Sequence, residues 1–223
     1  MSSPLHVIIT GATGMVGEGV LHTCLEHPQV ASVLIINRKS LGLSHPKLTE
    51  VLHADFYDLS AIENQLKGYN ACFFCLGVSS VGMKEADYFK VTYTLTMHVA
   101  EMLARLNPDM VFCYVSGQGT DSTEKGRSMW ARVKGKTEND LQKLPFSRVY
   151  AYRPGFIKPI TGLSKTHSFY KYVNWLYPLG RVLYPNGFNT LREVSLSMIY
   201  VAGHPYSERI LNGKEIAATA KEA

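Results

Sequence analysis

The chain has 223 residues, of which 46% are hydrophobic and 18% are charged, and its formal net charge at pH 7 is +5. This length allows one sizeable hydrophobic core, so we expect a single domain over residues 1–223. No apolar run reaches the roughly 18 residues that a membrane span requires, and no dense basic run points to nucleic acid. The N-terminus lacks a secretory signal pattern, and a cytoplasmic location is therefore expected.

The cysteines predict buried thiols rather than a disulfide or a metal site. Cys72 and Cys75 form a C-x-x-C pattern inside the apolar run 71–76, which is typical of a buried strand. Residues three apart on a strand point to opposite faces, so these two thiols do not converge. Cys24 and Cys113 also have apolar neighbours, and the histidines show no metal-ligand spacing. We expect reduced thiols and no metal ion.

Strand-like and helix-like segments alternate along the chain, which is typical of a parallel sheet covered by helices. The strands are expected at residues 5–10, 32–37, 48–53, 70–76, 110–116, 147–153 and near 214–217. The helices are expected after Gly14, near 59–66, over 88–106, over 128–144 and near 194–204. This order predicts an α/β fold, a doubly wound Rossmann-type domain with a mainly parallel sheet.

Beyond Pro154 the composition shifts towards aromatic residues and proline. We expect residues 155–190 to form an irregular and helical substrate or lid region over the carboxyl edge of the sheet, where such folds bind ligands. The aromatic segment from Phe169 to Tyr184 has three interpretations: a core or lid over a hydrophobic substrate, a homodimer surface, or a membrane-surface contact. Its aromatic residues are Phe169, Tyr170, Tyr172, Trp175, Tyr177 and Tyr184.

Glycines recur with the spacing G-x-x-G-x-x-G between the first expected strand and the first expected helix. Such a loop makes a tight turn, lets backbone approach a pyrophosphate, and presents the N–H groups of a helix N-terminus to the phosphates. The pattern therefore predicts a dinucleotide site, with a purely structural turn as the alternative. The expected contacts in this loop are Gly11, Thr13, Gly14, Met15, Val16 and Gly17.

The end of the second strand indicates which cofactor binds. NAD sites usually place an Asp or Glu there, whereas this chain reads Asn-Arg-Lys-Ser. The guanidinium of Arg38 can pair with a 2′-phosphate, and Asn37 and Ser40 can add neutral hydrogen bonds. The sequence therefore favours NADP(H) over NAD(H), with a plain surface arginine as the alternative. Asp55 is expected to bond the adenine amine, with Phe56 beside it.

Short motifs follow one another along nearly the whole chain. They are the glycine loop, Asn37-Arg38, Ala54-Asp55, Cys75-Leu76-Gly77, Val115-Ser116-Gly117 and Arg153-Pro154-Gly155. In this order they resemble the short-chain dehydrogenases/reductases, in particular the atypical NAD(P)-binding branch with epimerase-like and Tat-interacting-protein-like members. The motifs are specific to that superfamily but not to one reaction.

The resemblance implies roles for further residues. Ser116 would hydrogen-bond a substrate carbonyl or alcohol. Lys134 would hold the nicotinamide ribose and lower the pKa of a catalytic tyrosine. The other cofactor contacts that the resemblance implies are Leu76, Gly77, Val78, Pro154 and Ile157.

The family's catalytic tyrosine is missing. Trp130 stands four residues before Lys134, where the family pattern Tyr-x-x-x-Lys places the phenol that exchanges a proton with the substrate oxygen. An indole N–H is a donor only and is not a usable acid at neutral pH. Trp130 also begins an apolar helix stripe, so simple packing is an alternative to lining the nicotinamide or substrate pocket.

The sequence leaves the function open between two classes. One is an NADP(H)-dependent oxidoreductase on an unidentified carbonyl or alcohol, with Ser116 polarising the oxygen and water or another pocket group supplying the proton. The other is a non-catalytic NADP(H)-binding sensor or interaction module with a regulatory protein partner. A structural protein with a vestigial site is the least favoured interpretation.

Overall fold

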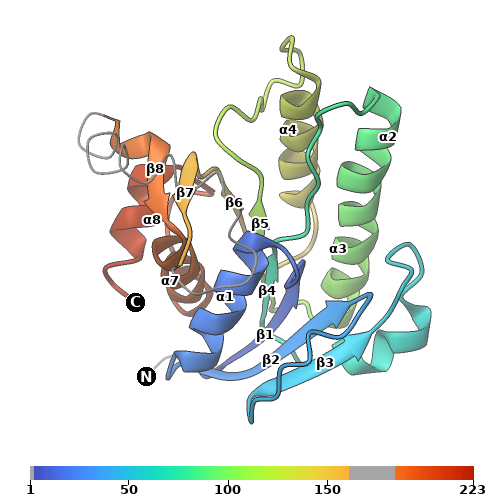
Figure 1. Ribbon diagram of the computed structural model, residues 1–223, viewed down its shortest axis with the longest axis vertical. Coiled ribbons are helices and arrows are strands. Elements are labelled where there is room, and N and C mark those ends of the chain that lie inside the picture. The colour runs from blue at the N-terminus through green and yellow to red at the C-terminus, as the bar shows by residue number, and fades with distance from the viewer. Residues whose placement is uncertain (1–2, 161–183) are drawn as a thin grey trace.

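A parallel β-sheet runs through the centre of the molecule (Figure 1). The computed structural model describes residues 3–160 and 184–223, so the aromatic segment up to Tyr177 lies outside the described residues. Within the described residues, the main sheet has seven strands in the order β3-β2-β1-β4-β5-β6-β9. Their bounds are β1 Leu5–Thr10, β2 Val30–Asn37, β3 Leu48–Leu52, β4 Ala71–Phe74, β5 Val111–Val115, β6 Arg148–Tyr152 and β9 Ile210–Leu211.

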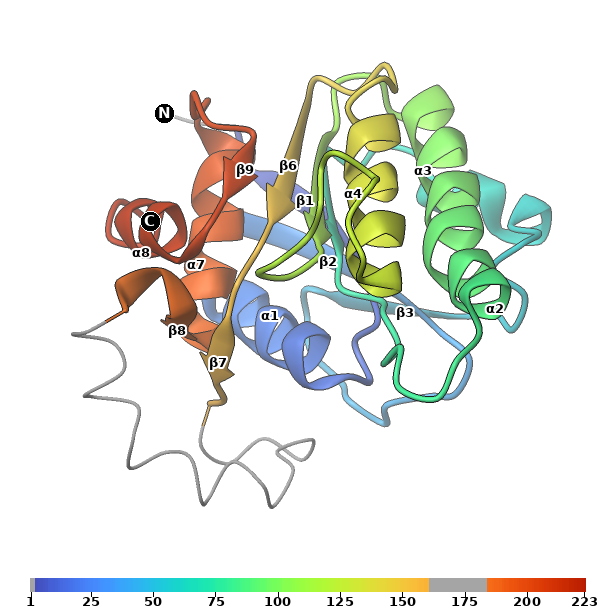
Figure 2. The ribbon, with the colours of Figure 1, turned by 90° about the horizontal axis from the view of Figure 1, so that it is seen from above.

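Helices cover both faces of this sheet (Figure 2). On one face lie α1 Met15–Glu26 and α7 Leu191–Gly203, with α8 Gly213–Thr219 beside α7. On the other face lie the 3₁₀ helix η1 Ser60–Leu66, α2 Glu85–Phe89, the π-helix η2 Lys90–Thr94, α3 Leu95–Leu106 and α4 Met129–Leu141. The doubly wound Rossmann-type fold predicted from the sequence is confirmed.

Two hydrophobic cores result from the alternation of side chains along the strands. Val7 and Ile9 of β1 pack under α1 and α7, whereas Ile8 points to the core beneath α3. The same alternation holds in β4, where Cys72 belongs to the second core and Phe73 to the first. Because both faces are buried, the strands read as continuous apolar runs.

The strand expected near 214–217 is wrong. Those residues belong to helix α8, and the edge strand is the short β9 that precedes it. The signal for a helix was present: Glu215 Oε2 accepts a hydrogen bond from the backbone N–H of Asn212 at 2.9 Å, as in a capping box. A small second sheet was not predicted from the sequence. In it, β7 Phe156–Lys158 pairs with β8 Phe188–Thr190, and the 3₁₀ helix η3 Pro185–Gly187 directly precedes β8.

Strand β4 is shorter than expected and ends at Phe74, so Cys75 lies just beyond the sheet. Cys24, Cys72 and Cys113 are buried, Cys75 is half-buried, and all four thiols are free. The described parts of the chain contain no group of three or more His, Cys, Asp or Glu side chains placed to hold a metal ion. In the same residues, no helix combines the length and the apolar character needed to cross a bilayer.

Candidate functional site

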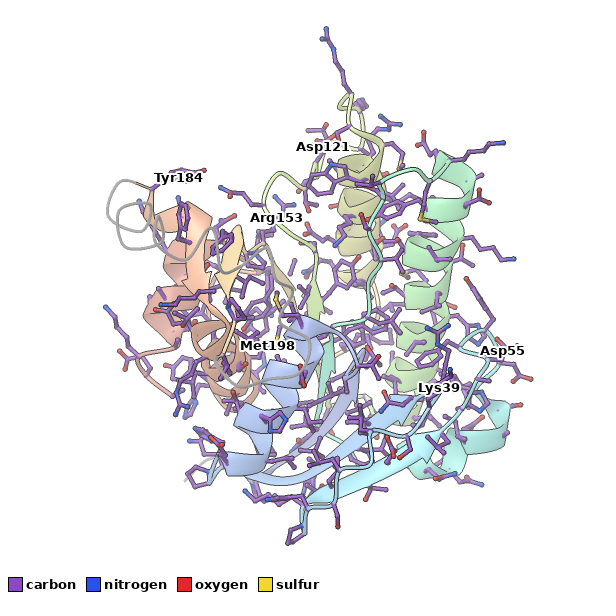
Figure 3. All side chains as sticks on the ribbon, viewed as in Figure 1. Lys39, Asp55, Asp121, Arg153, Tyr184 and Met198 are labelled. Atoms are coloured by element: carbon purple, nitrogen blue, oxygen red, sulfur yellow. The ribbon has the colours of Figure 1, made fainter. Side chains whose placement is uncertain are left out.

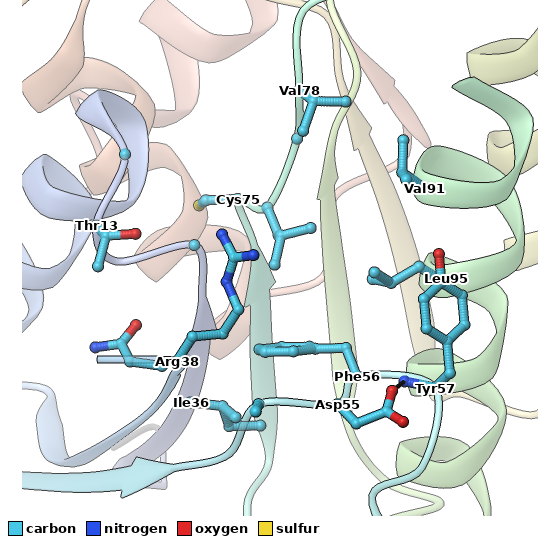
Figure 4. A pocket seen from close by; sticks show the side chains of 16 residues that line it. Thr13, Ile36, Arg38, Asp55, Phe56, Tyr57, Cys75, Val78, Val91 and Leu95 are labelled. Carbon is cyan, nitrogen blue, oxygen red and sulfur yellow. Dashed lines mark hydrogen bonds between the residues drawn. The ribbon is translucent and has the colours of Figure 1, made fainter. Parts of the chain in front are cut away.

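A cavity of about 520 Å³ lies at the carboxyl ends of the first four strands (Figure 4). Its walls are the segments that follow those strands, together with one face of the π-helix and α3. This is the place where the strand order turns, because β1 has β2 on one side and β4 on the other. The lining residues are Gly11, Thr13, Gly14, Ile36, Asn37, Arg38, Ala54, Asp55, Phe56, Tyr57, Cys75, Leu76, Gly77, Val78, Val91 and Leu95.

The glycine turn after β1 leaves no space for side chains at two positions. Gly11 has φ +73°, and a Cβ there would lie 2.7 Å from the backbone nitrogen of Leu76. A Cβ on Gly17 would lie 2.2 Å from the carbonyl oxygen of Gly11. The turn is therefore packed backbone to backbone against the end of β4 and the first turn of α1, as close approach to a phosphate chain requires.

The N-terminus of α1 faces the same cavity. Thr13 and Gly14 line it, and Met15, Val16 and Gly17 are the first helical residues behind them. The N–H groups of a first helical turn have no partner within the helix, and no side chain of the described residues caps this turn. The N–H groups of such a helix end and the positive end of the helix dipole suit an anion.

Arg38 extends into the cavity from the end of β2, with Thr13 to one side and Phe56 to the other (Figure 4). Asn37 forms part of the wall and is almost fully buried. Lys39, the residue after Arg38, does not line the cavity and is exposed in the segment that follows β2 (Figure 3). Among the described residues that line the cavity, Arg38 is therefore the one with a positively charged side chain.

Strand β2 ends without an Asp or Glu of its own, but the neighbouring strand β3 places the carboxylate of Glu50 next to its end. Its Oε1 accepts hydrogen bonds from Asn37 Nδ2 at 3.0 Å and from the backbone N–H of Leu41 at 2.9 Å, and its Oε2 accepts one from Ser40 Oγ. Burial opposes ionisation of Glu50, but these hydrogen bonds outweigh it and lower its pKa. Asn37 and Ser40, which the sequence assigned to a 2′-phosphate, are therefore bonded to Glu50.

On the far wall, Asp55 and Phe56 both line the cavity. Asp55 Oδ1 accepts a hydrogen bond from the backbone N–H of Tyr57 at 2.8 Å, which forms a tight turn after β3. Tyr57 donates from its hydroxyl to the carbonyl oxygen of Lys90 at 3.1 Å, in the π-helix that also brings Val91 to the cavity. The sequence missed Ile36, Ala54, Tyr57, Cys75, Val91 and Leu95.

The two residues proposed for chemistry lie outside this cavity, at the end of β5. Ser116 donates its hydroxyl to the carbonyl oxygen of Tyr152 at 3.0 Å. The ammonium of Lys134, on α4, donates to the carbonyl oxygens of Ser116 and, at 3.5 Å, Val115. Burial lowers the pKa of Lys134 from 10.5 to about 8, and the nearby Glu138 partly opposes this. Pro154 and Ile157, also outside the cavity lining, follow β6 on the same edge.

The loop after β5 is held between two aromatic side chains. The ring of Trp130 lies over Gly119, where an added Cβ would sit 3.4 Å from Cη2. On the other side, Gln118 Nε2 donates to the hydroxyl of Tyr184 at 2.5 Å, and the Gln118 backbone N–H donates to Pro154. Trp130 is half-buried, so it packs on the loop while keeping one part of its surface open.

These features define a Rossmann-type dinucleotide site, and the sequence comparisons agree. Residues 7–149 match the NAD dependent epimerase/dehydratase family, which is more than half of the chain. The chain belongs to this family and has its NAD(P)-binding fold. The resemblance to an atypical short-chain dehydrogenase/reductase is thereby confirmed.

Two relatives illustrate the branch. The chain is 32% identical over 160 residues to "Protein fmp52, mitochondrial" of Aspergillus clavatus, covering 68% of this chain and 66% of that protein. It is 26% identical over 153 residues to "Protein HTATIP2" of Rattus norvegicus, covering 68% of this chain and 62% of that protein. The chain thus spans slightly less than two thirds of the length of these relatives.

The cytoplasmic location expected from the sequence is wrong by this comparison. The fmp52 proteins of Aspergillus clavatus, Aspergillus fumigatus and Scheffersomyces stipitis are all named mitochondrial. The lack of a secretory signal pattern bears on secretion alone, so it gave no basis for choosing among compartments inside the cell.

Solved structures share the fold at low sequence identity. A short chain dehydrogenase from Burkholderia cenocepacia in complex with NADP has a TM-score of 0.66 at 14% identity, covering 96% of this chain and 91% of that one. The Bordetella bronchiseptica enzyme WbmF in complex with NAD+ has a TM-score of 0.65 at 15% identity, covering 99% and 78%. Both cofactors therefore occur among proteins of this fold.

Proposed function

We propose that the chain binds NADP(H) in the cavity beside the glycine turn and acts as an oxidoreductase on a carbonyl or alcohol substrate. The observation that carries the proposal is the position of Arg38, which extends into a cavity that the uncapped N-terminus of α1 also faces. The helix end suits a pyrophosphate, and the guanidinium suits a further phosphate on the ribose.

The residues present fit such a cofactor. Gly11 and Gly17 give backbone access that a Cβ at either position would remove. Phe56 and Ile36 offer an apolar surface for an adenine ring, and Leu76 to Val78 lead from the cavity towards the ends of β5 and β6. A nicotinamide cofactor, when bound, supplies or accepts a hydride.

The chain's own contribution to chemistry would come from the end of β5. The Ser116 hydroxyl keeps its oxygen lone pairs, and the Ser116 backbone carbonyl oxygen accepts a hydrogen bond from Lys134, whose ammonium charge is desolvated by burial. This pair would orient a substrate oxygen and the nicotinamide ribose. Since Trp130 offers no acidic proton, the proton would come from water or another polar group at this edge.

One observation favours the alternative of a non-catalytic NADP(H) sensor. The Ser116 hydroxyl already donates its proton to the carbonyl oxygen of Tyr152, so it is not free to donate to a substrate oxygen. In a sensor, the cofactor would shift the equilibrium between states of the loop at 117–120 and no proton transfer would be needed.

Calorimetry with NADPH and NADH tests the proposal. Micromolar binding of NADPH, tighter than that of NADH, is the expected result. If neither cofactor binds, the assignment of the cavity fails. Turnover of NADPH with any aldehyde, ketone or quinone then separates the oxidoreductase from the sensor.

A further inference from the structure

We propose that Glu50 is a specificity-determining residue of the cofactor site, which limits the preference for a 2′-phosphorylated cofactor that Arg38 confers. This inference rests on the proposed NADP(H) binding and adds an opposing residue to it. The sequence around Arg38 alone predicts a site selective for NADP(H); the contacts of Glu50 predict one that accepts both cofactors.

The first step is the position of the carboxylate. Glu50 lies on β3, paired in register with Ile35 of β2, and its side chain reaches forward to the segment that leaves β2. There it accepts hydrogen bonds from Asn37, Ser40 and the backbone of Leu41. Asn37 itself lines the cavity, so the carboxylate stands one hydrogen bond behind the cavity wall.

The second step is the competition for donors. A ribose 2′-phosphate held by Arg38 needs additional donors to complete its shell of hydrogen bonds. The candidates next to Arg38 are the Asn37 amide and the Ser40 hydroxyl, and both already donate to Glu50. A 2′-phosphate would gain their hydrogen bonds only by taking them from the carboxylate.

The third step is charge. Among the described residues, no Lys, Arg or His nitrogen forms an ion pair with Glu50, so its charge is held by neutral donors alone. Its lowered pKa keeps it ionised at neutral pH. An uncompensated negative charge repels a phosphate group at this end of the cavity and leaves a neutral 2′-hydroxyl unaffected.

The test uses two nucleotides that differ only in the 2′-phosphate, adenosine 2′,5′-bisphosphate and 5′-AMP. Calorimetry gives the ratio of their dissociation constants for the wild type and for Glu50→Gln, which keeps the side-chain shape. The expected result is a preference for the bisphosphate that rises about three- to tenfold in Glu50→Gln. High salt should reduce this gain, because screening weakens the repulsion in the wild type.

Glu222→Gln provides the matched control, since it changes the net charge equally. It lies in the exposed C-terminal residues after α8, at the opposite edge of the sheet from β3 (Figure 1). Its ratio should equal that of the wild type. The affinity of Glu50→Gln for 5′-AMP and its melting temperature report whether the site still forms.

Two results would overturn the inference: an unchanged ratio in Glu50→Gln, or an equal loss of affinity for both nucleotides, which would make Glu50 a purely structural support. Failure of the proposed function has a different signature. In that case the wild type binds neither nucleotide, or Arg38→Gln leaves the ratio of the two dissociation constants at its wild-type value. The ratio in Glu50→Gln is a separate measurement, so the two failures can be told apart.

Discussion

Glu138 and Arg153 form a largely buried ion pair near the end of β6, beside the loop that follows β5. Arg153 Nε lies 3.1 Å from both carboxylate oxygens of Glu138, and the side chains are 14% and 3% exposed. Arg153 also donates to the hydroxyl of Ser122 at 2.5 Å, and Figure 3 shows Arg153 and Asp121 in this region. The pair therefore joins α4, β6 and the loop.

Replacing Glu138 by Gln should strongly destabilise the fold. The change leaves the Arg153 guanidinium buried without its counter-charge, and the loss of one partner of a buried pair costs about 3–5 kcal/mol. Urea unfolding of Glu138→Gln measures this. The double variant Glu138→Met/Arg153→Met, which removes both charges, should recover a large part of the loss. A single variant within 0.5 kcal/mol of the wild type, roughly the scatter of neutral surface changes, would contradict the assignment.

Lys134 should make the stability of the wild type rise with pH in the alkaline range relative to that of Lys134→Met, whereas the buried thiols and phenols, whose pKa values burial raises, act in the opposite direction in both proteins. Burial lowers its pKa from 10.5 to about 8, so between these values the folded protein holds fewer protons than the unfolded chain. Raising the pH through this window therefore increases the contribution of Lys134 to stability, by no more than about 3 kcal/mol. Lys134→Met should lack this contribution, so the difference in stability between the two proteins isolates it. Parallel pH dependences for both proteins would show that Lys134 has an ordinary pKa.

Two alanine substitutions on α1, Gly17→Ala and Gly19→Ala, should differ in their effect on NADPH binding. Gly17→Ala places a Cβ 2.2 Å from the backbone oxygen of Gly11, so the turn must open and NADPH binding should be lost. Gly19→Ala places one 2.2 Å from a side-chain methyl of Leu191, which shifts more easily than backbone. We expect Gly19→Ala to cost about 1–3 kcal/mol of stability and to retain binding. Equal NADPH affinities in the two variants would refute this view of the turn.

Arg38→Gln should weaken NADPH binding about 10- to 100-fold, because a charge-assisted hydrogen bond is worth about 1.5–3 kcal/mol. NADH binding should change little. Lys39→Gln is the matched control, since it removes a neighbouring positive charge that lies outside the cavity lining. Equal losses in both variants would indicate that only the general positive field matters.

Trp130→Tyr should restore a proton donor at the position where the family pattern places one. With a reducible carbonyl substrate, NADPH oxidation is expected to rise by about 10²–10⁴-fold, the usual value of general acid catalysis. Wild-type turnover equal to that of the variant would show that another group already supplies the proton.

The fold could be predicted because both faces of the sheet are buried and its strands are continuous apolar runs. The segment at 214–217 resembles a strand because the short apolar run that starts at Ile216 has no helical period, and the capping contact between Asn212 and Glu215 becomes visible only in the structure. The β7–β8 pair joins strands of three residues each that are about 30 positions apart in the sequence, and no local pattern indicates such a pairing.

The cavity wall was predicted where it follows glycines and strand ends, but Glu50 was not. The sequence pattern for cofactor choice considers only a carboxylate at the end of β2. In the sheet, a side chain of the neighbouring strand β3 also reaches the end of β2. Glu50 lies on the same face of the sheet as Ile35 because the two residues are paired in the register of β2 and β3, and this register cannot be obtained from the sequence pattern of 48–52. Ser116 was located correctly at the end of β5, but its bond to Tyr152 depends on β6 lying alongside.

The strand order reverses between β1 and β4, and this reversal affects how a bound ligand would stabilise the sheet. The cavity is lined from one half of the sheet by the segments after β1, β2 and β3, and from the other half by the segment after β4 together with Val91 and Leu95. A ligand seated there is a non-covalent cross-link between the two halves of the sheet, so neither half can separate without first releasing it. Amide hydrogen exchange in both halves should slow together as the ligand concentration rises, and the midpoint of thermal unfolding becomes a gauge of occupancy.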